Sequence, residues 1–201
     1  MDFSVIQNNL ENKGYIVKIF NNEKEVNEYL NNELDNQTIG IGGTLTVEQL
    51  GLYETLKNHN KIYWHWKPVD GLSPDEMRKI SKDTDIYFSS VNAISETGEI
   101  INIDNNCDRV SNTLFGHKKV YFLVGKNKIT KTEEDAVFRA RNVAAPLNAQ
   151  RLNKKTPCAI KADKCYNCKS PDRICRALSI LWEKPAGCEY EVIFINKDLG
   201  Y

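Results

Sequence analysis

Short apolar runs typical of strands alternate with amphipathic helical patterns along most of the chain, and this alternation constrains the fold more than any other feature. The pattern predicts strands at 15–20, 38–43, 61–64, 85–90, 118–125, 178–184 and 190–196. It predicts helices at 22–34, at 44–56, after Ser73 and at 130–144. This order indicates βαβ units, so we predict an α/β fold with a mainly parallel sheet and helices on both faces.

Residues typical of helix ends support these boundaries. Asn22 and Glu25 have the spacing of a capping box, and so do Thr46 and Gln49. Ser73 is followed by proline and, three residues on, by a glutamate, which is typical of a helix start.

Two further features concern turns. We expect residues 93–103 to form a hairpin that turns at 96–98. Pro146 should stop or kink the helix that precedes it, because proline lacks the N–H that a helix interior requires.

Length and charge exclude several classes of protein. A chain of 201 residues can bury one substantial core, and its formal net charge of zero gives no global attraction to nucleic acid or anionic membrane. No run approaches the roughly 18 apolar residues of a membrane span, and the first residues lack the basic and apolar regions of a signal peptide. We therefore expect one cytoplasmic domain over 1–201, with a cysteine-rich insertion at 156–177 and with neither nucleic acid nor a membrane as partner.

Four of the six cysteines lie within eighteen residues, with the spacing C-x6-C-x2-C-x6-C. Two intervening residues allow the central sulfurs to face one centre, and the outer cysteines can fold over the same point. Four thiolates suit tetrahedral zinc or an iron–sulfur cluster, and the spacing does not choose between them. Buried free thiols and a dithiol redox switch are the alternatives. The predicted metal ligands are Cys158, Cys165, Cys168 and Cys175.

The segment around these cysteines is strongly basic. Residues 151–176 contain eight lysines and arginines but only two acids, Asp163 and Asp172. A zinc or [4Fe–4S] centre bound by four thiolates is negative, so these cations would stabilise it. Cys107 and Cys188 lie outside the cluster, and Cys188 is either a spare ligand or a cysteine in a hairpin turn.

A glycine-rich turn is the second candidate site. Gly42, Gly43 and Thr44 lie where a predicted strand gives way to a helix, so backbone N–H groups there can point at an anion. The turn matches neither a Walker A loop nor the full G-x-G-x-x-G pattern, and an ordinary tight turn is the alternative.

Polar residues at other strand ends extend this candidate site. Asn92 and Asp104 follow predicted strands, and open α/β sheets bind ligands at the carboxyl ends of their strands. Asp104 is a candidate general base or ligand clamp, and the alternative is that it caps a turn. The Trp-His-Trp run at 64–66 is either core packing at a strand end or a platform on which a ligand stacks.

Together these motifs resemble the lactate-utilisation (LUD) domain family in its short, single-domain form. The resemblance is carried by residues 40–46, 65–68, 90–94, 102–104, 109–110, 124–129, 142–149 and 156–175. Its most specific stretches are Asn-Val-Ala-Ala-Pro and Ser-Pro-Asp-Arg-Ile-Cys. It implies a Rossmann-like fold akin to sugar-phosphate isomerases and CoA transferases, in which a glycine-rich turn after an early strand binds phosphate or carboxylate.

The resemblance also guides the choice of site residues. With it, we predict ligand-binding roles for Gly42, Gly43, Thr44, Asn92, Arg109, Asn142 and Asn148, and a catalytic role for Asp104. One departure concerns the loop after Asn-Ile-Asp, where the family resemblance leads us to expect a glycine. This chain has Asn-Asn-Cys-Asp at 105–108, so the shape of that loop is an open question.

Three functional hypotheses follow. The first is an enzyme or redox component of organic-acid metabolism that binds a small anionic metabolite and holds a [4Fe–4S] cluster, with a redox protein as partner. The second is a binding or assembly protein with structural zinc, and the third is a sensor of an organic acid. The sequence leaves open the substrate and whether the chain forms a homodimer.

Overall fold

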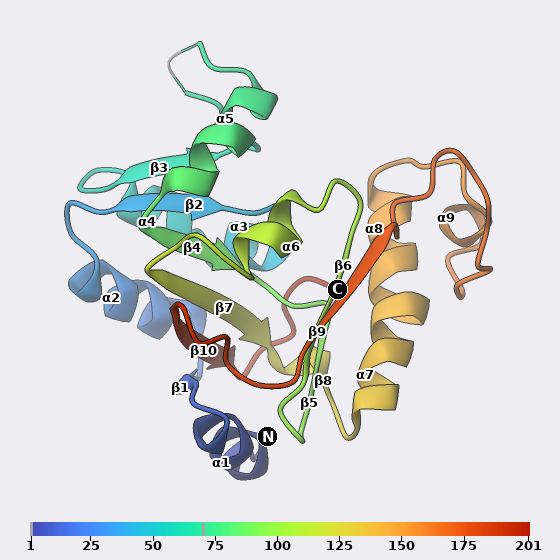
Figure 1. Cartoon of the computed structure of the whole chain (residues 1–201), viewed down its shortest axis with the longest axis horizontal. Coiled ribbons are helices and arrows are strands. Elements are labelled where there is room, and N and C mark those ends of the chain that lie inside the picture. Colours follow the sequence, from blue (N-terminus) through green and yellow to red (C-terminus); the bar gives the residue numbers. More distant parts are fainter. Residues whose placement is uncertain (1, 70) are drawn as a thin grey trace.

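The computed structural model of the chain describes residues 2–69 and 71–201. Its centre is a six-stranded sheet in which all neighbouring strands are parallel (Figure 1). In spatial order the strands are β1 (Ile16–Phe20), β10 (Glu189–Ile195), β7 (Lys119–Gly125), β4 (Ile86–Ser89), β2 (Thr38–Ile41) and β3 (Lys61–Trp64). The predicted α/β fold with a mainly parallel sheet is confirmed.

Side chains alternate between the two faces of this sheet. In β7, Tyr121 and Leu123 pack in the same core as helices α2 (Glu23–Glu33), α3 (Leu45–Leu50) and α4 (Leu52–Leu56). Phe122 and Val124 pack on the opposite face with helix α1 (Ser4–Asn12) and a second, smaller sheet. Helix α1 lies outside the sequence predictions, although its buried Ile6 and Leu10 have helical spacing.

Two of the three predicted helix starts are confirmed. The Asn22 side chain accepts from the backbone N–H of Glu25 at the start of α2, and Ser73 forms a capping box with Glu76 at the start of α5 (Pro74–Ile80). Further helices in the described part of the chain are η1 (Ser81–Asp83), α6 (Asp108–Asn112), η2 (Lys126–Lys128) and α9 (Pro157–Lys161), and three more follow below.

The single helix expected over 44–56 is wrong. The chain breaks at Gly51, which has a positive φ of 69°, and α3 and α4 lie on either side of it. Thr44, not Thr46, caps α3, because the Thr46 hydroxyl and the Gln49 side chain are engaged with residues far along the chain.

The expected hairpin forms the middle of the smaller sheet. Strands β5 (Ala93–Ser95) and β6 (Ile100–Asp104) pair antiparallel, with β8 (Ile129–Thr130) beside β5 and β9 (Ala177–Leu181) beside β6. The strand predicted at 178–184 therefore exists as β9, but it joins this sheet and not the parallel one. Helix α7 (Glu133–Arg139) packs against the hairpin.

The helix predicted at 130–144 does not stop at Pro146. Helix α7 continues through a π-helical turn, η3 (Ala140–Ala144), into α8 (Ala145–Arg151). Proline cannot donate to the preceding turn and its ring clashes there. The wide π turn relieves this clash, so the helix passes through Pro146 and extends seven residues beyond the expected end.

Helix α8, helix α9 and the cysteine-rich chain that follows form a lobe, which we call the cysteine lobe (residues 145–176). In Figure 1 the arrows of β2, β4 and β7 point towards this lobe, so the carboxyl ends of the parallel strands face it. None of the helices in the described part of the chain is long and apolar enough to cross a membrane.

Candidate functional site

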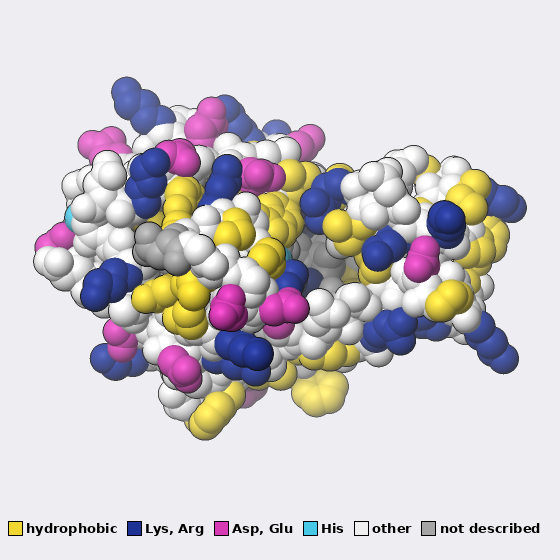
Figure 2. Space-filling view, turned by 90° about the horizontal axis from the view of Figure 1, so that it is seen from above, with side chains coloured by type: hydrophobic (Ala, Val, Ile, Leu, Met, Phe, Trp, Pro, Cys, Tyr) yellow, Lys and Arg dark blue, Asp and Glu magenta, His cyan; other side chains and the backbone are white. Residues whose placement is uncertain are grey.

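A cavity of about 370 Å³ lies between the carboxyl ends of the main strands and the cysteine lobe. We call it the main cavity. Viewed from above, the surface is hollowed between the main body and the cysteine lobe, and lysine and arginine side chains border the hollow (Figure 2). This is the position at which open α/β sheets bind their ligands.

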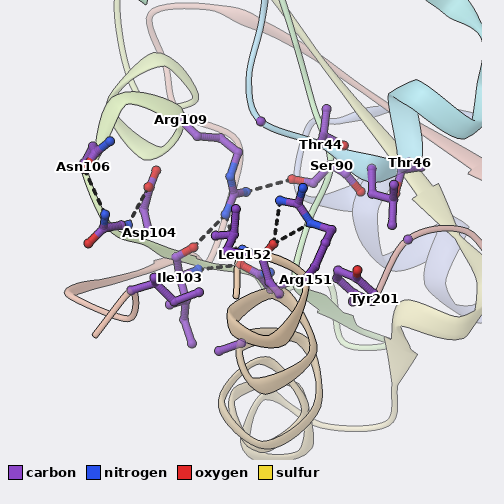
Figure 3. Close-up of a pocket in the computed structure, with 18 of the residues that line it drawn as sticks. Thr44, Thr46, Ser90, Ile103, Asp104, Asn106, Arg109, Arg151, Leu152 and Tyr201 are labelled. Carbon is purple, nitrogen blue, oxygen red and sulfur yellow. Dashed lines mark hydrogen bonds between the residues drawn. The ribbon is translucent and has the colours of Figure 1, made fainter. Parts of the chain in front are cut away.

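The lining comes from segments that follow several strands and from several helices. Gly43 and Thr44 follow β2, Trp66 follows β3, and Asn92 follows β4. Arg109 on α6 and Arg151 on α8 both reach into the cavity (Figure 3). Of the predicted site residues, the structure brings Gly43, Thr44, Asn92, Asp104, Arg109 and Asn148 together here.

Gly42 does not line the main cavity in the described structure, but it makes room for a residue that does. A Cβ atom on Gly42 would lie 2.8 Å from the Tyr87 hydroxyl oxygen and 3.0 Å from Cγ of Arg109. The Gly42 carbonyl accepts from Nε1 of the buried Trp64 at 3.0 Å. Trp64 is therefore part of the core, whereas His65 and Trp66, the rest of the aromatic run, line the cavity.

The guanidinium of Arg109 is held by neutral acceptors. It donates to the Ser90 and Ile103 carbonyls and to the side-chain oxygens of Asn92 and Asn102. These four bonds fix the position of the charge without neutralising it. Asn92 therefore acts here mainly by orienting Arg109.

Two further basic side chains lie close to Arg109, and neither is among the site residues that the sequence predicts. Lys128, at the end of η2, is buried and lines the main cavity. Arg139 of α7 is half-buried and donates to the Asn92 and Asn127 carbonyls. None of these three basic side chains forms an ion pair with a carboxylate among the described residues.

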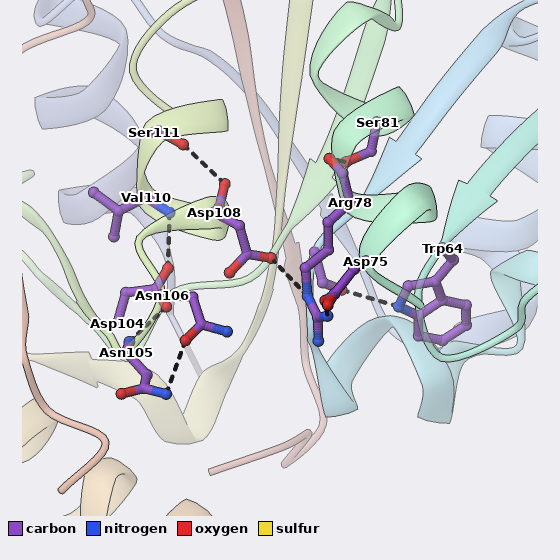
Figure 4. A network of polar contacts seen from close by, with 11 residues as sticks. Trp64, Asp75, Arg78, Ser81, Asp104, Asn105, Asn106, Asp108, Val110 and Ser111 are labelled. Carbon is purple, nitrogen blue, oxygen red and sulfur yellow. Dashed lines mark hydrogen bonds and ion pairs between the residues drawn. The ribbon is translucent and has the colours of Figure 1, made fainter. Parts of the chain in front are cut away.

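The carboxylates in the lining are engaged at the edge of the cavity. Asp104 accepts from the backbone N–H groups of Asn105 and Val110, so it caps the loop and the start of α6. Asp108 pairs with Arg78 of α5 at 3.6 Å, and Arg78 also pairs with Asp75 (Figure 4). The whole lining has five lysines and arginines and two carboxylates, which are Arg78, Arg109, Lys128, Arg151 and Lys154 against Asp104 and Asp108.

The loop at 105–108 has the shape that a glycine would favour. Cys107 adopts a left-handed backbone conformation, with a φ of 64° and a ψ of 7°. The chain therefore keeps a glycine-like bend with a cysteine in the strained position.

Arg151 and Trp66 connect the cysteine lobe to the main body. The Arg151 guanidinium lies over the Trp66 ring, 4.9 Å from its centroid, and donates to the Asn148 side chain. Burial and the neighbouring Arg78 lower the pKa of His65, so this histidine is neutral at neutral pH.

All four predicted metal-ligand cysteines line a second, small cavity in the cysteine lobe. We call it the cysteine cavity. Most of its remaining wall is apolar, and Arg141 and Arg173 also contribute to it. Among the described residues, no three or more histidine, cysteine or acidic side chains are arranged to hold a single metal ion.

The predicted ligand residue Asn142 supports this second cavity. It lies on the π turn, and its side-chain oxygen accepts from the Cys165 N–H at 3.1 Å. Arg173 donates to the Cys168 and Cys175 carbonyls, which fixes the fold of the cysteine loop. Cys188 packs instead against the main core, and its thiol donates to the Glu189 carbonyl.

The two cavities are neighbours. Ala145 and Ile174 line both of them, so the wall between the main cavity and the cysteine cavity includes these two apolar side chains. Helix α8 contributes Asn148 and Arg151 to one side of this wall, and Pro146 and Ala149 to the other.

Comparison with known proteins gives a family and a fold. A family model described as the LUD domain matches residues 4–195. A crystal structure of a DUF162 family protein from Deinococcus radiodurans is similar over 98% of this chain and 99% of that chain, with 14% identity and a TM-score of 0.52. A crystal structure of eIF2B beta from Chaetomium thermophilum covers 56% of this chain and 44% of that one, with 10% identity and a TM-score of 0.36. Among curated proteins there is no match.

Proposed function

The chain belongs to the LUD domain family, and from this premise we propose that it binds a small organic-acid anion in the main cavity and holds a [4Fe–4S] cluster between Cys158, Cys165, Cys168 and Cys175. The family description connects the chain with lactate-type metabolism. The residues around the two cavities support the finer assignment.

One observation carries the anion site. Arg109 and Arg139 lie together beside the buried amine of Lys128, and all three side chains donate only to neutral acceptors. Buried or partly buried cations without a countercharge are costly, and proteins normally pair them. An organic acid in the main cavity would supply the missing negative charge. At about 370 Å³ the cavity is of the size that proteins use for small ligands, and a three-carbon acid would fill only part of it.

The glycine-rich turn has a smaller part in this proposal than in the sequence-based hypothesis. Helix α3, which follows the turn, has only six residues, and its cap Thr44 accepts from Val47. The helix dipole acts over the first turn alone and is modest in size. The cations around the cavity therefore supply most of the attraction for an anion.

The chemistry of the cysteine cavity fits a cluster. Four soft thiolate donors surround one small apolar space, and arginines lie beside it. The same four sulfurs could hold a single zinc ion at about 2.3 Å from one point. We prefer the cluster because the family is connected with organic-acid metabolism. When bound, the cluster would supply electron transfer or Lewis-acid chemistry next to the main cavity.

The metal assignment is tested on protein purified without oxygen. We expect absorption near roughly 400 nm and about four irons per chain. Cys168→Ala should lower the iron content, whereas Cys188→Ser, which alters a cysteine of the core, should not. A colourless protein with one zinc per chain would contradict the cluster and favour the structural-zinc hypothesis.

The anion site is tested separately by calorimetry with L-lactate, pyruvate, citrate and sulfate at constant ionic strength. We expect at least one of them to bind, and Arg109→Met to weaken that binding by tenfold or more, because a charged hydrogen-bonding group is lost. Lys118→Met removes an equal charge from an exposed ion pair away from the cavity and serves as control. Equal losses in the two variants would point to general electrostatics and not to a site.

A further inference from the structure

Lys128 lies in a cage of three oxygen atoms at the wall of the main cavity. Its side chain is buried, with 4% of its surface exposed. Its Nζ is 2.9 Å from the Thr46 hydroxyl, 2.9 Å from the Ser90 hydroxyl and 3.1 Å from the Val91 carbonyl. These three contacts fix the position of the Lys128 amine.

The hydrogen atoms in this cage can be assigned. Ser90 already donates its hydroxyl hydrogen to the Leu123 carbonyl at 2.6 Å, so it accepts from Lys128. The Val91 carbonyl can only accept. Thr46 is the variable member, because its hydroxyl can donate either to Nζ or to the Leu199 carbonyl at 3.5 Å.

The cage therefore satisfies both protonation states of Lys128. A neutral amine would donate to Ser90 and Val91 and accept from Thr46 with its lone pair. An ammonium would donate to all three, with the Thr46 hydrogen turned towards Leu199. Rotation of the Thr46 hydroxyl together with the gain of one proton at Nζ converts the first arrangement into the second.

The charged groups around the cage favour the neutral amine as long as no anion is bound. Arg139 of α7 and Arg109 of α6 face Lys128, and both are permanently charged. The elements that supply the cage, α3 and the segment after β4, contribute hydroxyls and a carbonyl. The segment after β10 also packs here, because a Cβ atom on Gly200 would lie 3.1 Å from Nζ, and the neighbouring Tyr201 lines the same cavity. Burial first, and then these two guanidiniums, place the pKa of Lys128 well below its ordinary value.

An anion in the main cavity reverses this balance, because a negative charge nearby favours the ammonium. We propose that anion binding in the main cavity is coupled to the uptake of one proton by Lys128. The proton comes from water or buffer and bonds to the Nζ lone pair, and no covalent bond of the anion changes. This inference rests on the proposed anion site and adds the group that adjusts its charge to the ligand.

The test is calorimetric titration with L-lactate and with sulfate, neither of which titrates between pH 7 and 9. Each titration is run in imidazole and in Tris, two buffers that do not compete as anions and that differ in heat of ionisation. The difference in binding enthalpy gives the number of protons taken up. We expect about one proton per anion in the wild type, and an affinity that falls about tenfold per pH unit once free Lys128 is neutral.

Two variants identify the group that takes up the proton. Lys128→Met, which keeps an unbranched side chain one heavy atom shorter and removes the amine, should bind at least tenfold more weakly and with no proton uptake. His65→Gln removes the histidine of the same cavity and should keep the uptake. Should Lys128→Met fail to fold, the wild type and His65→Gln in the two buffers still show whether a proton is taken up and whether His65 is the group that takes it up, and either the absence of uptake or its loss in His65→Gln overturns the inference.

The outcomes separate the inference from the function on which it rests. Anion binding without proton uptake overturns the role of Lys128 and leaves the anion site intact. Uptake that survives Lys128→Met and disappears in His65→Gln also overturns it, because His65 is then the acceptor. If neither anion binds at any pH, the proposed anion site fails, and the inference fails with it.

Discussion

Replacing Cys107 with glycine tests how much strain the loop at 105–108 stores. A residue with a side chain pays about 1–2 kcal/mol in the left-handed conformation of Cys107. Glycine avoids this cost, but it gains freedom in the unfolded chain, which offsets about 0.4–1 kcal/mol. We therefore expect Cys107→Gly to raise the free energy of unfolding by about 0.5–1 kcal/mol, or the melting temperature by about 1–4 °C.

The assay is urea denaturation followed by circular dichroism, with Cys107→Ala as the matched control. Alanine removes the thiol but keeps the Cβ atom, so the difference between the two variants isolates the backbone effect. If Cys107→Gly is no more stable than Cys107→Ala, the reasoning from the backbone angle is refuted. Iron content should be unchanged in both variants, since Cys107 is not among the residues that line the cysteine cavity in the described structure.

Three further predictions concern the two parts of the molecule. Gly42→Ala places a Cβ atom 3.0 Å from Cγ of Arg109, so it should lower the free energy of unfolding by about 1–3 kcal/mol and weaken sulfate binding in calorimetry. Trp66→Ala removes the ring over which the Arg151 guanidinium lies. Without this cation–π interaction, which contributes about 0.5–2 kcal/mol, Arg151 is held less firmly, and sulfate binding should weaken by about 2- to 30-fold. Glu99 is buried, which raises its pKa, but hydrogen bonds from Lys13, Ser95 and Thr97 outweigh burial and lower the pKa to about 2. Because the folded pKa lies below the unfolded one, Glu99 stabilises the fold above about pH 4.5 and this contribution is lost as the pH falls towards 2. Urea titrations from pH 7 to 3 should therefore show Glu99→Gln less stable than wild type at pH 7, with the gap narrowing in acid.

The parallel sheet could be predicted from the sequence because its strands are local apolar runs. Tyr121 and Leu123 alternate with Phe122 and Val124, and both sets find a core. The sheet that a strand joins could not be predicted in the same way, because it depends on pairing with strands far along the chain. The run that forms β9 looks like any other strand, yet its partner is β6 and not the parallel sheet.

The continuation of the helix through Pro146 also could not be predicted from local sequence rules. The rule that proline ends a helix assumes an α-helical turn before it, and the chain uses a π turn instead. That turn directs Asn142 to the cysteine loop. The sequence predicts this residue as a ligand of the anion, whereas its observed partner is the backbone N–H of Cys165.

Lys128 shows why part of the candidate site could not be predicted from the sequence. In the sequence it is one lysine of three in the run Lys-Asn-Lys-Ile-Thr-Lys, and such a run is usually a solvated surface. Its burial follows from three oxygens contributed by the segments around 46 and 90, which only the fold brings together. A sequence pattern can mark a strand end as polar, but it cannot show which charged side chain turns inward.

The arrangement of α8 gives a reason to treat the two cavities as one functional unit. Its residues alternate between them: Asn148 and Arg151 face the main cavity, while Pro146 and Ala149 line the cysteine cavity. Ala149 and Arg151 lie on the same helix, so a change in how the cysteine loop packs against Ala149 would also move Arg151 relative to Trp66. Because protein interiors are closely packed, a centre bound by the four cysteines would hold α8 in place and thereby shape the anion site without touching it. The mechanical connection through α8 and the thin apolar wall of Ala145 and Ile174 both favour a protein in which the state of the cysteines and the occupancy of the main cavity depend on each other.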